Sequence, residues 1–277
     1  MTTEAKPLIL VACDDGVTSP GLRAAVRAVL DLGDVIVSAS CDQQTGAGRS
    51  LPAFNDGAIH EIDFEVDGQR VPAYAVHGSP AQAVLYALVD LVPRAMRAKR
   101  VPALCVSGIN FGENVGSQVT TSGTVGAALE AADGGVPGLA VSLETDKAFH
   151  YHHSDEVDFT VAAHFTHFFA ARLLERRMPF DVDVLKVDVP CDAKPGTLWR
   201  MTRLSRQRYF RPLPSGRRNL ADKIRLGYDM FVDHAGLEAN SDVEALVVDR
   251  VVAVTPLSLD LTSRVPLGEV EALLRQA

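Results

Sequence analysis

Short apolar runs alternate with stretches of helical periodicity along the first two thirds of the chain. The runs that predict buried strands cover residues 8–13, 34–40, 102–108, 137–143 and 183–190. The stretches that predict helices cover residues 21–33, 79–92, 121–135 and 157–177, and Ser79 and Pro80 begin the second of them. Strands that alternate with helices favour a mainly parallel sheet with helices on both faces.

The pattern changes in the last third of the chain. Residues 199–223 are rich in arginine and contain turn residues, which predicts a projecting arm or hairpin. Residues 250–260 then predict a returning strand, and residues 268–277 predict a short terminal helix. We find no internal repeat and no low-complexity tract.

Composition narrows the class of protein. Apolar residues make up 47% of the 277 positions and charged residues 22%, which is typical of a soluble globular protein. The net charge of −8 disfavours binding to nucleic acid polymers or acidic membranes. No apolar run reaches the roughly 18 residues that span a membrane, and the apolar run after Lys6 is too short for a signal peptide, so we expect a cytoplasmic protein. Three of the four cysteines lie in or beside apolar runs, which favours buried thiols over disulfides.

Two adjacent carboxylates, Asp14 and Asp15, follow directly on the first apolar run. Like charges in contact repel each other and resist burial without a partner. Adjacent strand residues point to opposite faces, so both carboxylates reach one point only if the chain bends, which Gly16 permits. The pair is therefore either a solvated turn or the site of a cation, and the Asp-Asp-Gly sequence by itself favours the turn.

Polar, glycine-rich segments also follow other predicted strands, at residues 38–50, 106–118 and 120–132. Ligands bind at the carboxyl ends of strands in open parallel sheets, and glycine-rich backbone before a helix is a ready phosphate site. Each segment alone is explained by turns and a helix N-cap. Three of them beside the Asp pair favour a metal and phosphate centre, and the all-oxygen donor set suits Mg²⁺ or Mn²⁺.

Other candidates are weaker. The chain has no GxxxxGK[ST] phosphate loop. The segment "HYHHSDE", residues 150–156, is crowded and loop-like, which predicts a solvated loop rather than a zinc site. Aromatic residues of the basic arm could stack on nucleic acid bases, but in an acidic chain a subunit contact or a guide for a substrate phosphate is favoured.

The order of these segments resembles the survival protein E (SurE) family of metal-dependent nucleoside monophosphate phosphatases. The matching stretches are "DDGVTSPGL", "SGINFGENVG", "SGTVGAALEA", "GVPGLAVSL", "TRLSRQRY" and "VTPLSLDLT", in family order from Asp14 to Thr262. The resemblance implies a single Rossmann-like α/β domain over residues 1–277, with an arm at approximately residues 199–240. It also implies that the arm helps to form a homodimer or homotetramer.

The resemblance further implies a site. One divalent cation per subunit, Mg²⁺ or Mn²⁺, is expected on Asp14, Asp15, Thr45 and Asn110, with the two aspartates as the catalytic residues. The family has Ser where Thr45 stands. The positions expected to bind the substrate, mainly through its phosphate, are Ser107, Gly108, Asn114, Ser122, Gly123, Thr124 and, as a carboxylate near the family's active site, Asp260.

Two hypotheses for the function follow. The first is an enzyme that hydrolyses nucleoside 5′- or 3′-monophosphates, and short polyphosphate as well, by attack of a water or, as a less favoured route, of an aspartate. The second is a non-catalytic nucleotide-binding or sensing protein, because the chain departs from the family at Gln82, Ala83 and Arg264, where the family usually has other residues. Neither the preferred base nor the preferred sugar position follows from the sequence.

Overall fold

A computed structural model describes residues 6–95 and 100–275, so the chain terminus before Lys6 lies outside the described residues. Its strands are β1 (Leu8–Ala12), β2 (Asp34–Ser40), β3 (Ile59–Ile62), β4 (Glu65–Val66), β5 (Gln69–Arg70), β6 (Ala73–Val76), β7 (Leu104–Phe111), β8 (Gly138–Leu143), β9 (Val184–Val189), β10 (Trp199–Met201), β11 (Phe210–Pro212), β12 (Tyr228–Met230) and β13 (Val252–Leu257). The predicted strands correspond to β1, β2, β7, β8, β9 and β13, whereas β3 to β6 were not predicted. The α-helices are α1 (Pro20–Val29), α2 (Pro80–Tyr86), α3 (Val92–Ala95), α4 (Gly123–Asp133), α5 (Thr160–Glu175) and α6 (Leu267–Arg275). Short π- and 3₁₀-helical segments are η1 (Ala87–Leu91), η2 (Gly116–Thr121), η3 (Lys147–Phe149) and η4 (Glu244–Val248).

The central sheet has nine strands in the order β10-β13-β9-β8-β7-β1-β2-β6-β3. Six neighbouring strands of this sheet are parallel: β9, β8, β7, β1, β2 and β6. Their spatial order is that of the doubly wound Rossmann fold. The chain therefore builds outward from β1 in one direction and then restarts at β7 on its other side. This switch point between β1 and β7 is where folds of this kind bind ligands.

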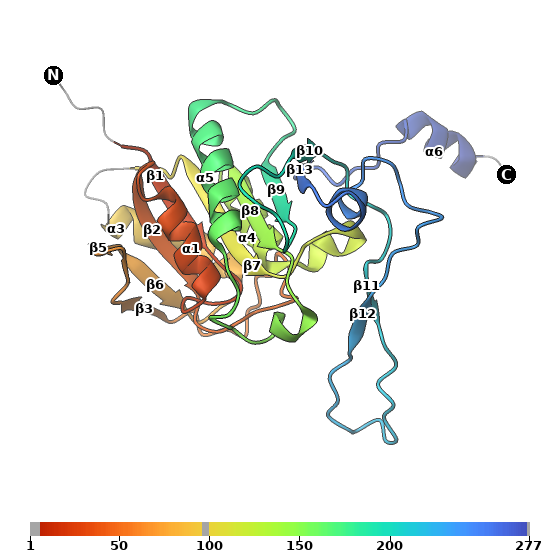
Figure 1. Ribbon diagram of the computed structural model, residues 1–277, viewed down its shortest axis with the longest axis horizontal. Helices are drawn as coiled ribbons and strands as arrows, with labels where there is room; N and C mark the ends of the chain where they lie inside the picture. Colours follow the sequence, from red (N-terminus) through yellow and green to blue (C-terminus); the bar gives the residue numbers. More distant parts are fainter. Residues whose placement is uncertain (1–5, 96–99, 276–277) are drawn as a thin grey trace.

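Helices cover both faces of the sheet, as the sequence predicts. Ile9 and Val11 of β1 face the layer that contains α1 and α5, which lies in front of the sheet in Figure 1. Leu8 and Leu10 face the opposite layer, which contains α2 and α4. Because both faces of β1 are covered, its sequence is a continuous apolar run rather than an alternating one.

Local sequence signals begin these helices. Ser19 caps α1 and precedes Pro20, the first helical residue. Gly21 lets α1 lie directly on β7, because a Cβ atom there would come within 2.0 Å of the Ile109 carbonyl oxygen. Ser79 and Gln82 form a reciprocal capping box at the start of α2.

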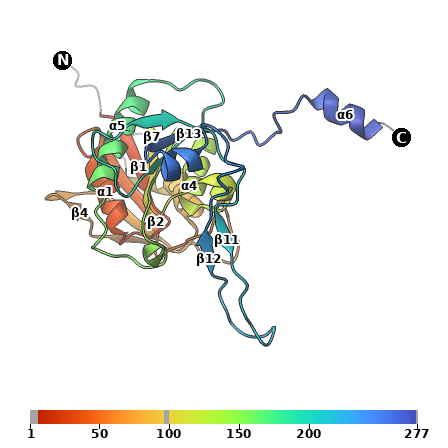
Figure 2. The same ribbon diagram turned by 45° about the vertical axis from the view of Figure 1, so that its right-hand side comes forward.

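The last third adds antiparallel structure and the arm. β13 pairs antiparallel with β9, and β10 pairs parallel with β13 at the edge of the sheet. β11 and β12 form the hairpin that projects from the body in Figures 1 and 2. The projecting arm is therefore shorter than the predicted segment 199–240, because Trp199–Met201 has joined the main sheet. Helix α6 forms as predicted, with every residue exposed, and lies away from the body in both views.

No helix among the described residues combines the length and the apolar character that crossing a membrane requires.

Candidate functional site

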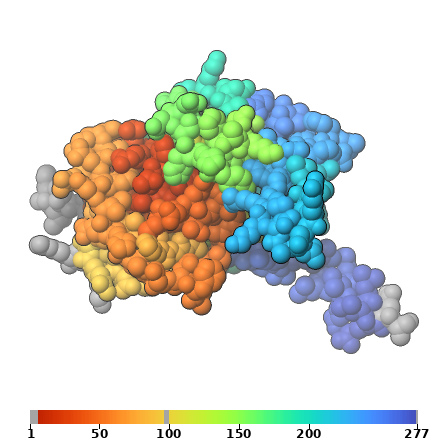
Figure 3. Space-filling view, turned by 90° about the horizontal axis from the view of Figure 1, so that it is seen from below, coloured from red at the N-terminus to blue at the C-terminus, as the bar shows by residue number. Residues whose placement is uncertain are grey.

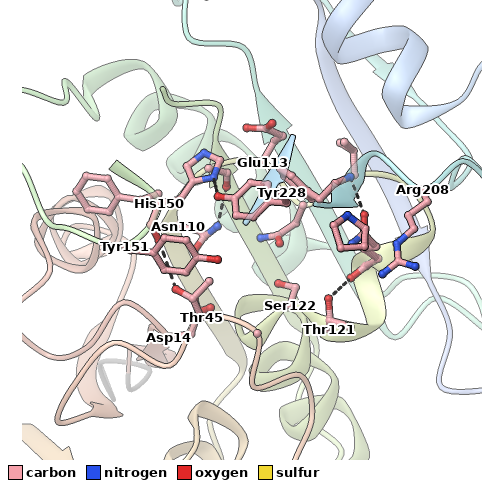
Figure 4. Close-up of a pocket in the computed structure, with 18 of the residues that line it drawn as sticks. Asp14, Thr45, Asn110, Glu113, Thr121, Ser122, His150, Tyr151, Arg208 and Tyr228 are labelled. Carbon is pink, nitrogen blue, oxygen red and sulfur yellow. Dashed lines mark hydrogen bonds between the residues drawn. The ribbon is translucent and has the colours of Figure 1, made fainter. Parts of the chain in front are cut away.

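The candidate site is a cavity of about 240 Å³ at the carboxyl ends of β1 and β7, the switch point of the sheet. Five separate parts of the chain line it: the end of β1, the loop after β2, the segment from β7 to α4, the loop around His150, and the arm. Figure 4 shows Asp14, Thr45 and Asn110 together at one end of this cavity, with Tyr228 and His150 beside them.

The two carboxylates of Asp14 and Asp15 are 4% and 1% exposed and point to different sides of the sheet end. Asp14 faces the start of α4, where the Thr124 hydroxyl donates to its Oδ1 at 2.6 Å. Asp15 faces the other way: Gln43 Nε2 donates to its Oδ1 at 2.8 Å, and the Phe111 N–H donates to its Oδ2 at 2.9 Å. The chain bends immediately afterwards at Gly16, whose φ is +93°.

Burial makes this pair electrostatically costly. Desolvation, and then the charge of Asp15, raises the pKa of Asp14 to about 7. Desolvation also raises the pKa of Asp15, to about 6, against the hydrogen bonds from Phe111 and Gln43. Neither carboxylate forms an ion pair with a described residue, although oxygens of both lie within 4.8 Å of each other and of the Cys13 sulfur. Two buried, unneutralised carboxylates fit a divalent cation, which would remove the cost of burying them.

Asn110 and Thr45 have oxygens that fit the same cation. The Asn110 Nδ2 group donates to the Gly112 carbonyl at 2.6 Å, which leaves the amide oxygen as an acceptor. The Thr45 hydroxyl donates to the His150 carbonyl at 3.5 Å, which leaves its lone pairs for another partner. Both residues line the cavity with Asp14. Three of the four residues that the resemblance assigned to the metal thus line one cavity. Asp15 does not line it, but its carboxylate lies within 4.8 Å of that of Asp14.

The residues expected at the substrate phosphate divide into two groups. Ser122 and Asn114 line the cavity, and Gly123 and Thr124 lie against Asp14 at the N-terminus of α4. Ser107 and Gly108 are instead buried within β7 and do not line the cavity. The Ser107 hydroxyl has no hydrogen-bond partner among the described residues.

The glycine-rich loop between β7 and η2 is held by hydrogen bonds from its backbone to buried carboxylates. The backbone N–H of Asn114 donates to Asp188 at 2.7 Å, and the N–H of Gly116 donates to Asp242 at 3.1 Å. Both carboxylates accept from Lys186, and all three charged side chains are completely buried. These two N–H groups therefore point into the protein, whereas the sequence predicted that the loop backbone would be available to a phosphate.

Asp260 was wrongly predicted to lie near the site. Strand β13 runs antiparallel to β9, so the chain leaves it at the edge of the sheet opposite the carboxyl ends of the parallel strands. Asp260 is exposed there and lines a different cavity, beside Ser258 and Asp183. Its carboxylate accepts from the Thr262 N–H at 2.7 Å.

The histidine segment is a largely solvated loop, as predicted, except at His150, whose burial the sequence did not indicate. His150 is 6% exposed and lines the cavity, where its Nδ1 lies 2.7 Å from the hydroxyl of Tyr228 on the arm. His153 Nε2 lies 2.6 Å from the Asp15 carbonyl oxygen. Spacing along the sequence could not indicate either contact, because each partner belongs to a remote segment.

Three further lining residues escaped the sequence analysis. Glu113 is 3% exposed, and burial raises the pKa of its carboxyl to about 7. Arg208 is the one permanently charged cation among the described residues that line the cavity. Tyr228 comes from the far strand of the arm. The "TRLSRQRY" stretch contains Arg208, so its basic character was the only signal for this group.

Comparisons with known proteins agree in naming one family. The family model described as survival protein SurE matches residues 9–211. The chain is 40% identical to the 5′-nucleotidase SurE of Methanothrix thermoacetophila over 273 residues, covering 96% of this chain and 98% of that protein. It is 38% identical to the 5′-nucleotidase SurE of Thermococcus gammatolerans over 271 residues, covering 96% and 95%. The crystal structure of the SurE protein from Aquifex aeolicus matches with a TM-score of 0.74 at 28% identity, covering 97% of this chain and all of that one.

The raised pKa of Asp14 predicts a pH-dependent effect of Asp14→Asn on stability when a chelator keeps cations away. The folded chain holds this proton up to about pH 7, whereas an unfolded Asp loses it near pH 4, so folding stability falls as pH rises through that window. The asparagine variant does not ionise. Its stability relative to wild type should therefore rise between pH 5 and pH 8 by a few kcal/mol, at about 1.4 kcal/mol per unit of pKa.

Urea unfolding at both pH values measures this difference. The exposed Asp155→Asn serves as the control and should follow wild type at both. An Asp14→Asn protein that loses stability relative to wild type between pH 5 and pH 8 would mean that the ionised carboxylate supports the fold.

Proposed function

The chain belongs to the survival protein SurE family and is a nucleotidase, and we propose that it hydrolyses nucleoside 5′- or 3′-monophosphates with one bound Mg²⁺ or Mn²⁺ per subunit. Short polyphosphate is a further substrate in this proposal. The enzyme acts in the cytoplasm on small nucleotides rather than on nucleic acid polymers or membranes, in keeping with its net charge of −8.

The observation that carries the metal dependence is the buried Asp14–Asp15 pair, for which the described residues provide no cation. Oxygen donors from carboxylates, an amide and a hydroxyl suit a hard divalent ion. Bound there, such an ion would neutralise the pair, polarise a phosphoryl oxygen and lower the pKa of water.

The chain's own residues fix the geometry around the phosphate. Thr124 and Gln43 hold the two carboxylates from opposite sides, so that neither rotates freely. The start of α4, with Ser122 at its N-cap, directs helix N–H groups towards this region, and such groups bind anions. Arg208 adds a positive charge at the cavity wall for an anionic substrate.

Hydrogen bonding favours attack by water over attack by an aspartate. The carboxylate oxygens of Asp15 both accept hydrogen bonds, and Oδ1 of Asp14 accepts from Thr124. Asp15 therefore has no free oxygen for attack, and Asp14 Oδ2 is the oxygen expected on the cation, whereas a nucleophile needs a free oxygen in line with the phosphorus atom.

The nucleoside part of the substrate has an aromatic wall available. Tyr151, Phe210 and Tyr228 line the cavity on the side of the arm. Aromatic faces stack on nucleobases without strong preference for one base. The combination of an acidic, oxygen-rich end and an aromatic end supports a nucleotide rather than a simple phosphate ester.

The departures from the family do not favour the non-catalytic alternative. Gln82 is a structural residue, because its side chain closes the capping box of α2 and donates to the Pro52 carbonyl at 3.0 Å. Arg264 is exposed and follows β13 on the edge opposite the cavity. Neither lies among the residues that line the site.

Hydrolysis of at least one nucleoside monophosphate should depend on an added divalent cation. A panel of 5′- and 3′-monophosphates and short polyphosphate, assayed by phosphate release, should show activity that a chelator abolishes and that Mn²⁺ or Mg²⁺ restores. Full activity in excess chelator would contradict the metal-dependent mechanism. Nucleotide binding without phosphate release would establish the sensing protein instead.

Thr45 should contribute a hydroxyl to the cation. Thr45→Ser keeps the oxygen, so activity should stay within about tenfold of wild type. Thr45→Val keeps the shape and removes the oxygen, so the Mn²⁺ dissociation constant should rise at least ~10–100-fold, the range seen even for residues behind the ligands. Calorimetric titration of all three proteins with Mn²⁺ measures the difference. An unchanged affinity in the valine variant would remove Thr45 from the ligand set.

The arm should hold subunits together as a dimer or tetramer. Its loop between β11 and β12 exposes Leu220 and Leu226 among several arginines, a surface poorly suited to remain in contact with water alone. Light scattering at micromolar concentration should therefore give at least twice the mass of 29.7 kDa. Replacing both leucines by serine should shift the protein towards the monomer, and a wild-type monomer would contradict the proposal.

A further inference from the structure

A continuous set of hydrogen bonds joins the arm to the carboxylate end of the cavity, and His150 lies at its centre. The imidazole Nδ1 is 2.7 Å from the Tyr228 hydroxyl, and Nε2 is 3.3 Å from the Thr145 carbonyl oxygen. A carbonyl can only accept, so Nε2 carries the proton and donates to Thr145. The unprotonated Nδ1 then accepts from Tyr228.

The backbone of His150 faces the expected cation ligands. Its carbonyl oxygen accepts from Gln43 Nε2 at 3.0 Å and from the Thr45 hydroxyl at 3.5 Å. The same Gln43 Nε2 donates to Asp15 at 2.8 Å. One carbonyl thus sets the orientation of one expected ligand directly and of another through a single side chain.

The imidazole ring of His150 also packs on Gly112, the residue that accepts a hydrogen bond from the expected ligand Asn110. A Cβ atom on Gly112 would lie 2.8 to 3.2 Å from three ring atoms, so the ring rests directly on this glycine's backbone. The Gly112 carbonyl accepts from Asn110 Nδ2 at 2.6 Å. Rotation of the ring would therefore disturb the turn that orients the Asn110 amide.

The arm has a second attachment to the same loop, and its lysine also lies 5.0 Å from the centroid of the Tyr228 ring. Lys147 forms an ion pair with Asp229 at 2.7 Å, and both side chains are largely exposed. Figure 3 shows the arm lying against the surface formed by the segment around residue 150. This neighbouring attachment allows general docking of the arm to be separated from the contact with the His150 ring.

We propose that Tyr228 is a positioning residue for the cation site and acts through His150. The proposal rests on the proposed function, because it concerns the cation that the function requires. Tyr228 fixes the ring with its hydroxyl, and the fixed ring holds the His150 carbonyl towards Gln43 and Thr45 and the Gly112 turn towards Asn110. The arm then contributes to cation affinity without touching the cation.

A double-mutant cycle with Mn²⁺ affinity as the readout tests this inference. Calorimetric titration without substrate is made on wild type, Tyr228→Phe, His150→Phe and the double variant. Both substitutions keep an aromatic ring and remove the hydrogen bond. Each single variant should bind Mn²⁺ about tenfold more weakly, the size of effect typical behind metal ligands. The double variant should be no weaker than His150→Phe, which also loses the hydrogen bond to Thr145, because both singles remove the same Tyr228–His150 interaction.

Asp229→Asn is the matched control. It removes the neighbouring ion pair on the same strand and should leave Mn²⁺ affinity unchanged. Equal weakening in this control would overturn the proposal, since general docking of the arm would explain it. Unchanged affinity in Tyr228→Phe, or losses that multiply in the double variant, would overturn it as well.

These outcomes are distinct from a failure of the proposed function. If wild type binds Mn²⁺ and hydrolyses nucleotides while the variants behave like wild type, only the proposed positioning role of Tyr228 is rejected. If wild type binds no divalent cation, the proposed function and this inference fall together. Should His150→Phe not fold, the comparison of Tyr228→Phe with Asp229→Asn still decides the question.

Discussion

Two adjacent carboxylates buried at the end of one strand are the constraint on which this site depends. An isolated buried charge costs several kcal/mol, and a second like charge beside it increases that cost. The alternation of strand side chains sends Asp14 and Asp15 to opposite sides, so each needs partners from a different layer. The start of α4 serves Asp14, and β7 with the loop after β2 serves Asp15. The positions of three remote segments are thus tied to a single pair of residues.

The topology explains why remote segments can meet there. In a parallel sheet all carboxyl ends lie along one edge, so the chain returns to this edge after each crossover. The order β2-β1-β7 makes the first strand and the fourth parallel strand neighbours, and their following loops diverge to opposite sides. A gap opens where they diverge. Asp14, Thr45 and Asn110 line it although more than sixty residues separate the last two along the chain.

The sequence predicted the structure where the signal was periodic or local. The apolar run before Asp14, the Ser79 cap and the bend at Gly16 depend on neighbouring residues, and the structure confirms all three. Asp260 was assigned from the resemblance alone, and the antiparallel direction of β13, which no local signal indicates, places it at the opposite edge of the sheet. The contacts of His150 were missed because its partner Tyr228 lies on the arm, remote in sequence.

The glycine-rich loop shows how flexibility and order are combined at the site. Its glycines permit the tight path from β7 to η2, but they also leave the backbone free to move. The buried group of Lys186, Asp188 and Asp242 opposes that freedom by accepting two of the loop's N–H groups. Buried ion pairs often add little net stability, because desolvation offsets their attraction. Here their effect is on geometry. The two carboxylates bind the N–H groups of the loop and hold its backbone in one position, which places Asn114 at the cavity.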